Sequence, residues 1–384
     1  MNRDLFLVVF SMMIWGVGEG MFYIFQPLYL QKLGADPLMI GGILGGLGLA
    51  MTVAQAPAGY LADRMGGRPL MWVAWSMGAA ATGLMALAQT LPVFVVGLFI
   101  YGLTAFVSAP MNHYIADVRG RWSVGRAFTV TQAGYNLGAI GGPLLGGWIG
   151  LQFGLATVYK VAFGIFVLSV LVILLIRPQP KTEVQASTAV VKLHRNPLFL
   201  GLLPFFFLTT LATFLPQTLT PNFLQNQHGL DYGQIGQLGS IGSAGIVLAM
   251  LALGNLPPLL GLLLGQAAIG LYAFFLWQGS GFPWFALGYF FIGGYRLTRA
   301  MALAYARPLV PNSQTGFAFG LIELVNGMAL FLAPFIGGWI YATQPPSLYT
   351  TSLFLGLGVF VLNLSFLPRI QRRVEKFQTE QSKL

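Results

Sequence analysis

Residues 125–149 read GRAFTVTQAGYNLGAIGGPLLGGWI, and residues 316–340 read GFAFGLIELVNGMALFLAPFIGGWI. The two stretches align without a gap at an offset of 191 residues, and both contain Pro-x-x-Gly-Gly-Trp-Ile at the same place. Each is long, apolar and carries a single charged residue, which is typical of a helix that crosses a membrane. The second half of the chain therefore repeats the first.

The repeat extends beyond these helices. Residues 34–36 match residues 229–231 at an offset of 195, whereas Gly102 matches Gly293 at 191. The offset therefore falls by four, and the change indicates a four-residue deletion near the loop between the eighth and ninth helices. Two parallel six-helix halves, related by an axis along the membrane normal, are typical of secondary transporters that rock between two states.

The composition agrees with a chain embedded in lipid. Of 384 residues, 56% are hydrophobic and 8% charged, whereas soluble domains carry about 25% charged residues. The net charge of +10 is not gathered into a basic patch, so no nucleic-acid partner is expected. Cysteine is absent and the three histidines are scattered, so we expect no disulfide and no metal site. Nucleotide motifs and catalytic arrangements are also missing, so no cofactor and no enzyme activity are expected.

Apolar runs between glycine, proline and charge breaks predict an all-α membrane protein with twelve transmembrane helices in two six-helix bundles. We predict an N-terminal bundle over 1–176, a cytoplasmic linker over 177–196, a C-terminal bundle over 197–368 and a cytoplasmic tail over 369–384. The helices are expected at 5–30, 38–62, 69–89, 92–116, 127–150, 159–176, 198–226, 232–253, 258–277, 283–306, 314–342 and 347–367.

The positive charges predict the orientation. Sixteen Lys and Arg residues fall in loops on one side, whereas Lys32 and Lys160 alone fall on the other. Cytoplasmic loops carry the excess of Lys and Arg. We therefore expect both termini in the cytoplasm and the chain in a bacterial inner membrane, as a monomer.

A motif after the second helix suggests a family. Residues 59–68 read GYLADRMGGR, which resembles the signature G-x-L-A-D-R-x-G-R-K of the major facilitator superfamily. The resemblance covers the whole chain and implies a gating role for this motif, in which the aspartate stabilises one conformation beside a helix N-terminus. The residues carried over are Gly59, Asp63, Arg64, Gly66 and Arg68, and Gly67 departs from the pattern.

A second motif lies on the fifth helix. Gly138, Gly142, Pro143, Gly146 and Gly147 fit G-x-x-x-G-P-x-x-G-G, which resembles the motif of drug/proton antiporters. Small residues also allow close helix packing without any role in selectivity. The family's helix-4 motif, R-x-x-Q-G, is not kept, because Leu98 and Tyr101 stand where it has Arg and Gln.

Four charged residues fall inside predicted helices, where each costs roughly 2.5–3.5 kcal/mol on insertion scales. Arg299 lies ~12 Å and Glu323 ~14 Å from the cytoplasmic ends of neighbouring helices, at 1.5 Å per residue. We therefore predict that Arg299 and Glu323 form an ion pair. Arg296 lies one turn deeper, and Glu19 lies ~21 Å into the first helix, near the middle of the membrane.

Glu19 is the predicted coupling residue, because a carboxylate at that depth is a functional candidate that can load and release a proton. The alternatives are a structural Glu19–Arg296 ion pair and a misplaced span. In the family, helices 1, 4, 7 and 10 line the central cavity. Polar and aromatic residues on these helices, suited to an amphipathic substrate, are its expected walls: Trp15, Tyr23, Gln26, Gln217, Tyr101, Tyr289, Tyr295 and Arg296.

These observations favour a proton-coupled exporter of small amphipathic molecules that works by alternating access. A second hypothesis is a symporter or exchanger of an anionic solute that binds at Arg296 and Arg299. A third, from another class, is a non-transporting membrane sensor or assembly factor built on a transporter scaffold. The expected partners are a small-molecule substrate, protons and the lipid bilayer.

Overall fold

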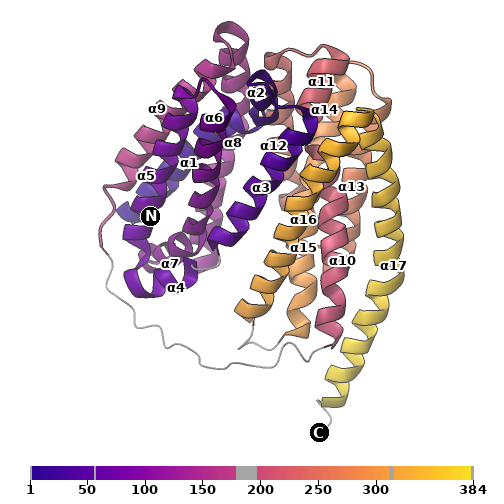
Figure 1. The fold of residues 1–384 in the computed structure, drawn as a ribbon. Coiled ribbons are helices and arrows are strands. Elements are labelled where there is room, and N and C mark those ends of the chain that lie inside the picture. The colour runs from indigo at the N-terminus through magenta and orange to yellow at the C-terminus, as the bar shows by residue number, and fades with distance from the viewer. Residues whose placement is uncertain (1, 56–57, 179–196, 311–314, 382–384) are drawn as a thin grey trace. The chain divides into compact units, whose positions relative to one another are not determined.

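The computed structural model describes residues 2–55, 58–178, 197–310 and 315–381, and every regular element in these ranges is a helix (Figure 1). In the first half they are α1 (Arg3–Tyr23), α2 (Gln26–Lys32), α3 (Pro37–Gln55), α4 (Ala58–Met65), α5 (Gly67–Leu87), α6 (Leu91–Leu103), η1 (Thr104–Val107), α7 (Ser108–Val118), α8 (Val124–Phe153) and α9 (Leu155–Ile173). In the second half they are α10 (Pro197–Phe214), η3 (Leu215–Gln217), α11 (Thr220–His228), α12 (Tyr232–Leu253), α13 (Pro258–Gln278), α14 (Phe282–Phe290), η4 (Phe291–Gly293), α15 (Gly294–Ala306), η5 (Arg307–Leu309), α16 (Thr315–Thr343) and α17 (Ser347–Gln381).

The predicted all-α membrane fold is confirmed. Joined across their breaks, the described helices form twelve segments at the predicted places. Ten of them are long and apolar enough to cross a membrane. The other two are less apolar, because α8 is rich in glycine and the α14–α15 segment contains Arg296 and Arg299.

The last helix is longer than predicted. A continuous helix, α17, runs from Ser347 to Gln381, whereas the prediction ended it at residue 367 and assigned 369–384 to a tail. Pro368 lies inside this helix and does not end it.

The chain divides into two compact units. The first unit contains Met1–Gln185 and Thr220–Ser243, and the second contains Ala186–Leu219 and Ala244–Leu384. The prediction placed the segment 220–243 in the second bundle, whereas α11 and the first half of α12 group with the first unit by their contacts; the bounds of the two bundles stay a prediction. Most of the predicted linker, 179–196, lies outside the described residues.

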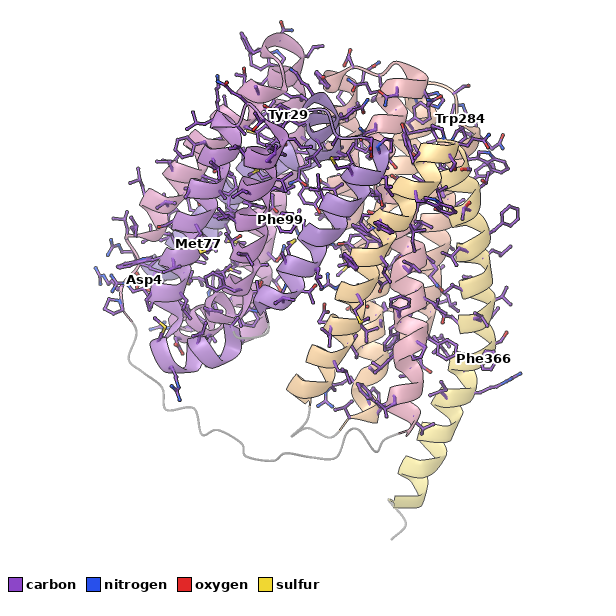
Figure 2. The ribbon with its side chains drawn as sticks, in the orientation of Figure 1. Asp4, Tyr29, Met77, Phe99, Trp284 and Phe366 are labelled. Atoms are coloured by element: carbon purple, nitrogen blue, oxygen red, sulfur yellow. The ribbon has the colours of Figure 1, made fainter. Side chains whose placement is uncertain are left out.

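Corresponding helices pack in the same pairs within each unit, so the repeat is present in the packing and not only in the sequence. In the first unit α1 packs on α8, and α5 packs on α9 and α6; in the second α10 packs on α16, and α13 packs on α17 and α14. Aromatic side chains fill the spaces between these helices. Tyr29 of α2, labelled in Figure 2, packs against Phe94 and Tyr159, with ring centroids 5.0 and 4.8 Å away.

The first and seventh segments break at equivalent positions. The first of them, α1, ends at Tyr23, and α10 ends at Phe214, an offset of 191 residues. A 3-10 turn, Leu215–Gln217, then precedes α11, whereas α2 follows α1 almost at once. The additional residues at this turn explain why the offset is 195 at Gly34 and Gly229, beyond the break.

A row of glycines brings α8 against α1. Gly134, Gly138, Gly142 and Gly146 recur every four residues, and a Cβ on any of them would collide with a backbone oxygen of α1. Those oxygens belong to Val9, Met13, Val17 and Met21, which also recur every four residues. Side chains at i and i+4 lie on one face of a helix, so this face of α8 must lack side chains for the two backbones to meet.

Candidate functional site

Glu19 lies at the close approach of α1 and α8. Its Oε2 atom accepts a hydrogen bond from the Tyr135 hydroxyl of α8, with the oxygens 2.9 Å apart. Tyr101 of α6 also lies close enough to Glu19 to interact with it electrostatically. A Cβ at Gly16, one turn before Glu19, would collide with the carbonyl oxygen of Tyr135. The glycine contacts therefore bring the Tyr135 side chain within reach of the carboxylate.

Aromatic rings surround the carboxylate on one side. Trp15 stacks on Tyr101, with ring centroids 6.0 Å apart and planes 19° apart. Trp15 also packs in an edge-to-face arrangement with Phe166, with ring centroids 4.4 Å apart, and Phe22 packs in the same way with Tyr101 at 5.4 Å. Glu19 itself is half-buried. The site thus combines one ionisable group with flat apolar surfaces.

The second unit has a neutral pair at the equivalent place. At the offset of 191 residues, Glu19 corresponds to Thr210 and Tyr135 corresponds to Asn326. The Thr210 hydroxyl donates a hydrogen bond to Asn326 Oδ1 at 2.7 Å. A hydrogen bond therefore joins α1 to α8 in the first unit and the equivalent helices, α10 and α16, in the second. Of these two bonds, only the one in the first unit involves a carboxylate. The packing of the fold does not require a charge there.

Arg299 and Glu323 lie together in the second unit, where the matched depths predicted a pair. Arg299 Nε donates to Glu323 Oε1 at 3.3 Å, and Arg299 Nη2 bonds to Glu323 Oε2. Each side chain is 30% exposed. The two-bond geometry fixes the guanidinium plane against the carboxylate, which is the arrangement that arginine forms best.

Arg296 is exposed, in contrast to Arg299. Its guanidinium lies 5.4 Å from the ring centroid of Tyr295, which in turn packs against Phe214 of α10 at 5.6 Å. Arg296 and Glu19 belong to different units, so the pairing considered between them stays a prediction.

The remaining predicted cavity residues fall in different environments. Tyr23 is 51% exposed, whereas Gln26 is 2% and Tyr289 3% exposed. Tyr289 packs edge-on against Tyr272 at 5.7 Å. Gln26 and Tyr289 are therefore buried in this structure, whereas Tyr23 is open to its surroundings, and the role of all three as cavity walls stays a prediction. Gln217 of η3 donates a hydrogen bond from Nε2 to the Thr213 carbonyl oxygen of α10 at 2.7 Å.

The motif at 59–68 joins α4 to α5. Gly66 has a φ of +80°, a backbone conformation that glycine adopts without strain. Arg68 Nε donates to the Ile176 carbonyl oxygen at 2.9 Å, and its guanidinium stacks 3.9 Å above the Trp72 ring. Arg64 is exposed. The side chain of Asp63 lies outside the described part of the chain, so the predicted gating role of Asp63 stays a prediction, as does the role of Gly59.

The helix-5 motif uses two faces of α8. Gly138, Gly142 and Gly146 meet α1, whereas Pro143 and Gly147 meet the backbone of Gly236 at the start of α12. The sequence prediction identified these residues but missed Tyr135. The only signal for Tyr135 was its position between Gly134 and Gly138, which does not reveal the side of the helix that faces Glu19.

Comparisons with known proteins give the family. The model of the Major Facilitator Superfamily matches residues 6–294. Multidrug resistance protein MdtG of Serratia proteamaculans is 28% identical over 207 residues, which cover 52% of this chain and 49% of that protein. Tetracycline resistance protein, class G, of Vibrio anguillarum is 34% identical over 137 residues, or 35% of each chain. An uncharacterised MFS-type transporter of Methanocaldococcus jannaschii is 27% identical over 156 residues, or 40% of each. The matches span about half the length of these curated relatives or less.

Solved structures match over nearly the whole chain. A variant of the nucleoside transporter NupG superposes with a TM-score of 0.82 at 13% identity, covering 94% of this chain and 99% of that one. A variant of the peptide transporter POT gives 0.81 at 16% identity, covering 97% and 96%. At such identity the likeness shows the fold alone. The family match covers most of the chain and agrees with the two repeated bundles. The chain belongs to the Major Facilitator Superfamily of membrane transporters, and it is not an enzyme.

Proposed function

We propose that the chain exports small amphipathic compounds in exchange for protons, by alternating access, and that Glu19 is the coupling residue. One observation carries the proposal: a single carboxylate is hydrogen-bonded to Tyr135 at 2.9 Å, where the second unit has the neutral pair Thr210–Asn326. The neutral pair shows that a hydrogen bond without a charge is enough to join these two helices. The carboxylate of Glu19 is therefore not needed for packing. A charge that the fold does not need, inside a membrane helix, is a functional candidate.

The surroundings of Glu19 suit such an exchange. When Glu19 is ionised, the Tyr135 hydroxyl stabilises the carboxylate; when Glu19 is protonated, its charge is removed at little cost in a membrane. Trp15, which is partly exposed and rests on the buried ring of Tyr101, offers apolar surface to a flat or lipophilic substrate, and aromatic rings also attract organic cations. Proton and substrate would thus compete for one carboxylate, which couples their movements.

The relatives support export. The similar proteins include a multidrug resistance protein and a tetracycline resistance protein. The solved structures with the same fold include nucleoside and peptide transporters. Because identity to these structures is low, they do not decide between export and uptake. The charge distribution supports insertion in a bacterial inner membrane with both termini in the cytoplasm, and we propose that the chain works as a monomer.

A second function is favoured by the exposed Arg296. Arg296 is exposed, whereas Arg299 is only partly exposed, so Arg296 is the stronger candidate of the two arginines to meet an anionic solute. An exchanger of such a solute would depend on Arg296 and not on Glu19. The family match favours both of these functions over a non-transporting sensor.

Proton release from detergent-solubilised protein tests the proposal. Lipophilic cations, neutral drugs and organic anions are added in turn to the wild type, Glu19→Gln, Arg296→Gln and the matched control Thr210→Val. We expect cations or neutral drugs to release protons from the wild type and from Thr210→Val, which loses the equivalent hydrogen bond but no ionisable group. Release should be absent in Glu19→Gln. Release that persists in Glu19→Gln, or binding of anions alone that is lost in Arg296→Gln, would overturn the proposal and favour the anion exchanger.

A further inference from the structure

Three amide side chains connect α2 and α11 within the first unit. Asn222 of α11 is 1% exposed, and its Nδ2 atom donates to the Pro27 carbonyl oxygen at 3.1 Å and to Gln31 Oε1 at 2.5 Å. Asn226, one turn later, donates to Gln31 Oε1 at 3.2 Å, and Gln31 Nε2 donates back to Asn226 Oδ1 at 3.4 Å. The buried Asn222 amide is thus bonded to Gln31, and Gln31 and Asn226, which are both exposed, bond to each other in both directions.

The contact joins equivalent residues of the two repeats. At the offset of 195 residues, Gln31 corresponds to Asn226, and Pro27 corresponds to Asn222. The helices end alike, because Gly34 and Gly229 follow them with φ values of +96° and +67°. A contact between equivalent residues is self-complementary, as in a two-fold symmetric dimer. Gln31 and Asn226 therefore meet where the two repeats approach each other about their common axis.

We propose that Gln31, Asn222 and Asn226 form an outer latch, which holds the non-cytoplasmic ends of the two repeats together and opens once in each transport cycle. The proposal rests on the alternating access proposed above. A transporter that works in this way must separate its repeats on one side of the membrane and then on the other. The outer latch is the place where α2 and α11 would have to part.

The chemistry of the latch suits a contact that forms and breaks. All three side chains are neutral amides, so opening the latch exposes no charge, and its strength does not change with protonation. Asn222 Oδ1 is buried without a hydrogen-bond partner among the described residues. A buried acceptor without a partner offsets part of the gain from the bonds that are made. The hydrogen bonds therefore stabilise the closed state only moderately, so that the latch can open.

Cross-linking tests whether the latch must open. The sequence contains no cysteine, so Gln31→Cys with Asn226→Cys introduces the only two thiols. A short, reducible bifunctional thiol reagent should link them and stop efflux of a lipophilic cation, and a reductant should restore it. The single variants Gln31→Cys and Asn226→Cys, treated alike, should stay active. Failure of the pair to link, or efflux that continues in the linked protein, would overturn the proposal.

A labelling measurement needs no substrate and separates this proposal from the proposed function. In a Gln26→Cys background the thiol should be protected from a membrane-impermeant maleimide, because residue 26 is 2% exposed. Adding Asn222→Leu should raise the labelling rate roughly two- to ten-fold, the range expected for loss of a hydrogen bond. The matched control Gln227→Leu removes an exposed amide of the same helix and should leave the rate unchanged. Faster labelling without any proton release would uphold the latch and reject proton coupling, whereas an unchanged rate with Asn222→Leu would reject the latch.

Discussion

The Tyr135 hydroxyl donates a hydrogen bond to Glu19 Oε2 across 2.9 Å, between two residues 116 positions apart in the sequence. The bond connects the helix-5 glycine motif to the carboxylate proposed to carry the proton. The motif can therefore affect transport through packing alone, because the contact of Gly138 with α1 sets the position of Tyr135.

Replacement of Tyr135 by Phe tests this connection. The variant keeps the ring and loses one donor to the carboxylate, and hydrogen bonds to charged groups contribute about 1.5–3 kcal/mol. We expect proton release on addition of a lipophilic cation to persist, with the apparent affinity for the cation changed by about tenfold or more. Asn326→Leu, at the equivalent place in the second unit, serves as the control and should leave that affinity unchanged. Identical titrations for Tyr135→Phe and the wild type would show that the bond plays no part in binding.

The glycine row predicts a sharp difference between neighbouring positions of α8. A Cβ at Gly138 would collide with the Met13 carbonyl oxygen, whereas a Cβ at Gly141 meets nothing within 4 Å. Gly138→Ala should therefore lower the free energy of unfolding by about 1–3 kcal/mol, the usual cost of overpacking. Gly141→Ala should be neutral or stabilising, because alanine favours the helix. Thermal unfolding in detergent measures both, and equal melting temperatures would contradict the close approach of α1 and α8.

Much of the fold could be predicted from the sequence, because span length and repeat offset are properties of the chain alone. The depth of a charged residue along its helix also follows from the sequence alone. The similar depths of Arg299 and Glu323 therefore predicted that they would form an ion pair. The rotation of a helix about its axis could not be predicted. Lipid and protein core are both apolar, so the apolar pattern of α8 does not show that Tyr135 faces Glu19, nor that Tyr289 turns toward Tyr272. The break between α10 and α11 was missed although Pro216 and Gln217 lie at it, because the prediction treated residues 198–226 as one span across this proline.

The ion pair in the second unit predicts strong coupling between two substitutions. Glu323→Gln leaves the Arg299 guanidinium without its carboxylate, and loss of one partner of a buried pair costs about 3–5 kcal/mol. Because each side chain is 30% exposed, we expect a cost below that range. The double variant Arg299→Gln with Glu323→Gln should recover much of the loss. A double-mutant cycle on thermal stability measures the coupling, and strictly additive effects would mean that the pair does not stabilise the fold.

Arg68 and Arg64 belong to one motif but should respond differently to replacement by lysine. Arg68 bonds to the Ile176 carbonyl oxygen and stacks on Trp72, and thus connects the start of α5 to the chain just beyond α9. Lysine keeps the positive charge, and with it the predicted topology, but has no planar group for the stacking contact. Arg68→Lys should therefore lower the melting temperature, at a cost of about 1 kcal/mol, while Arg64→Lys, at an exposed position, should not. If Arg64→Lys lowers transport without lowering stability, Arg64 acts in gating; if neither variant changes either quantity, the motif needs only its charge.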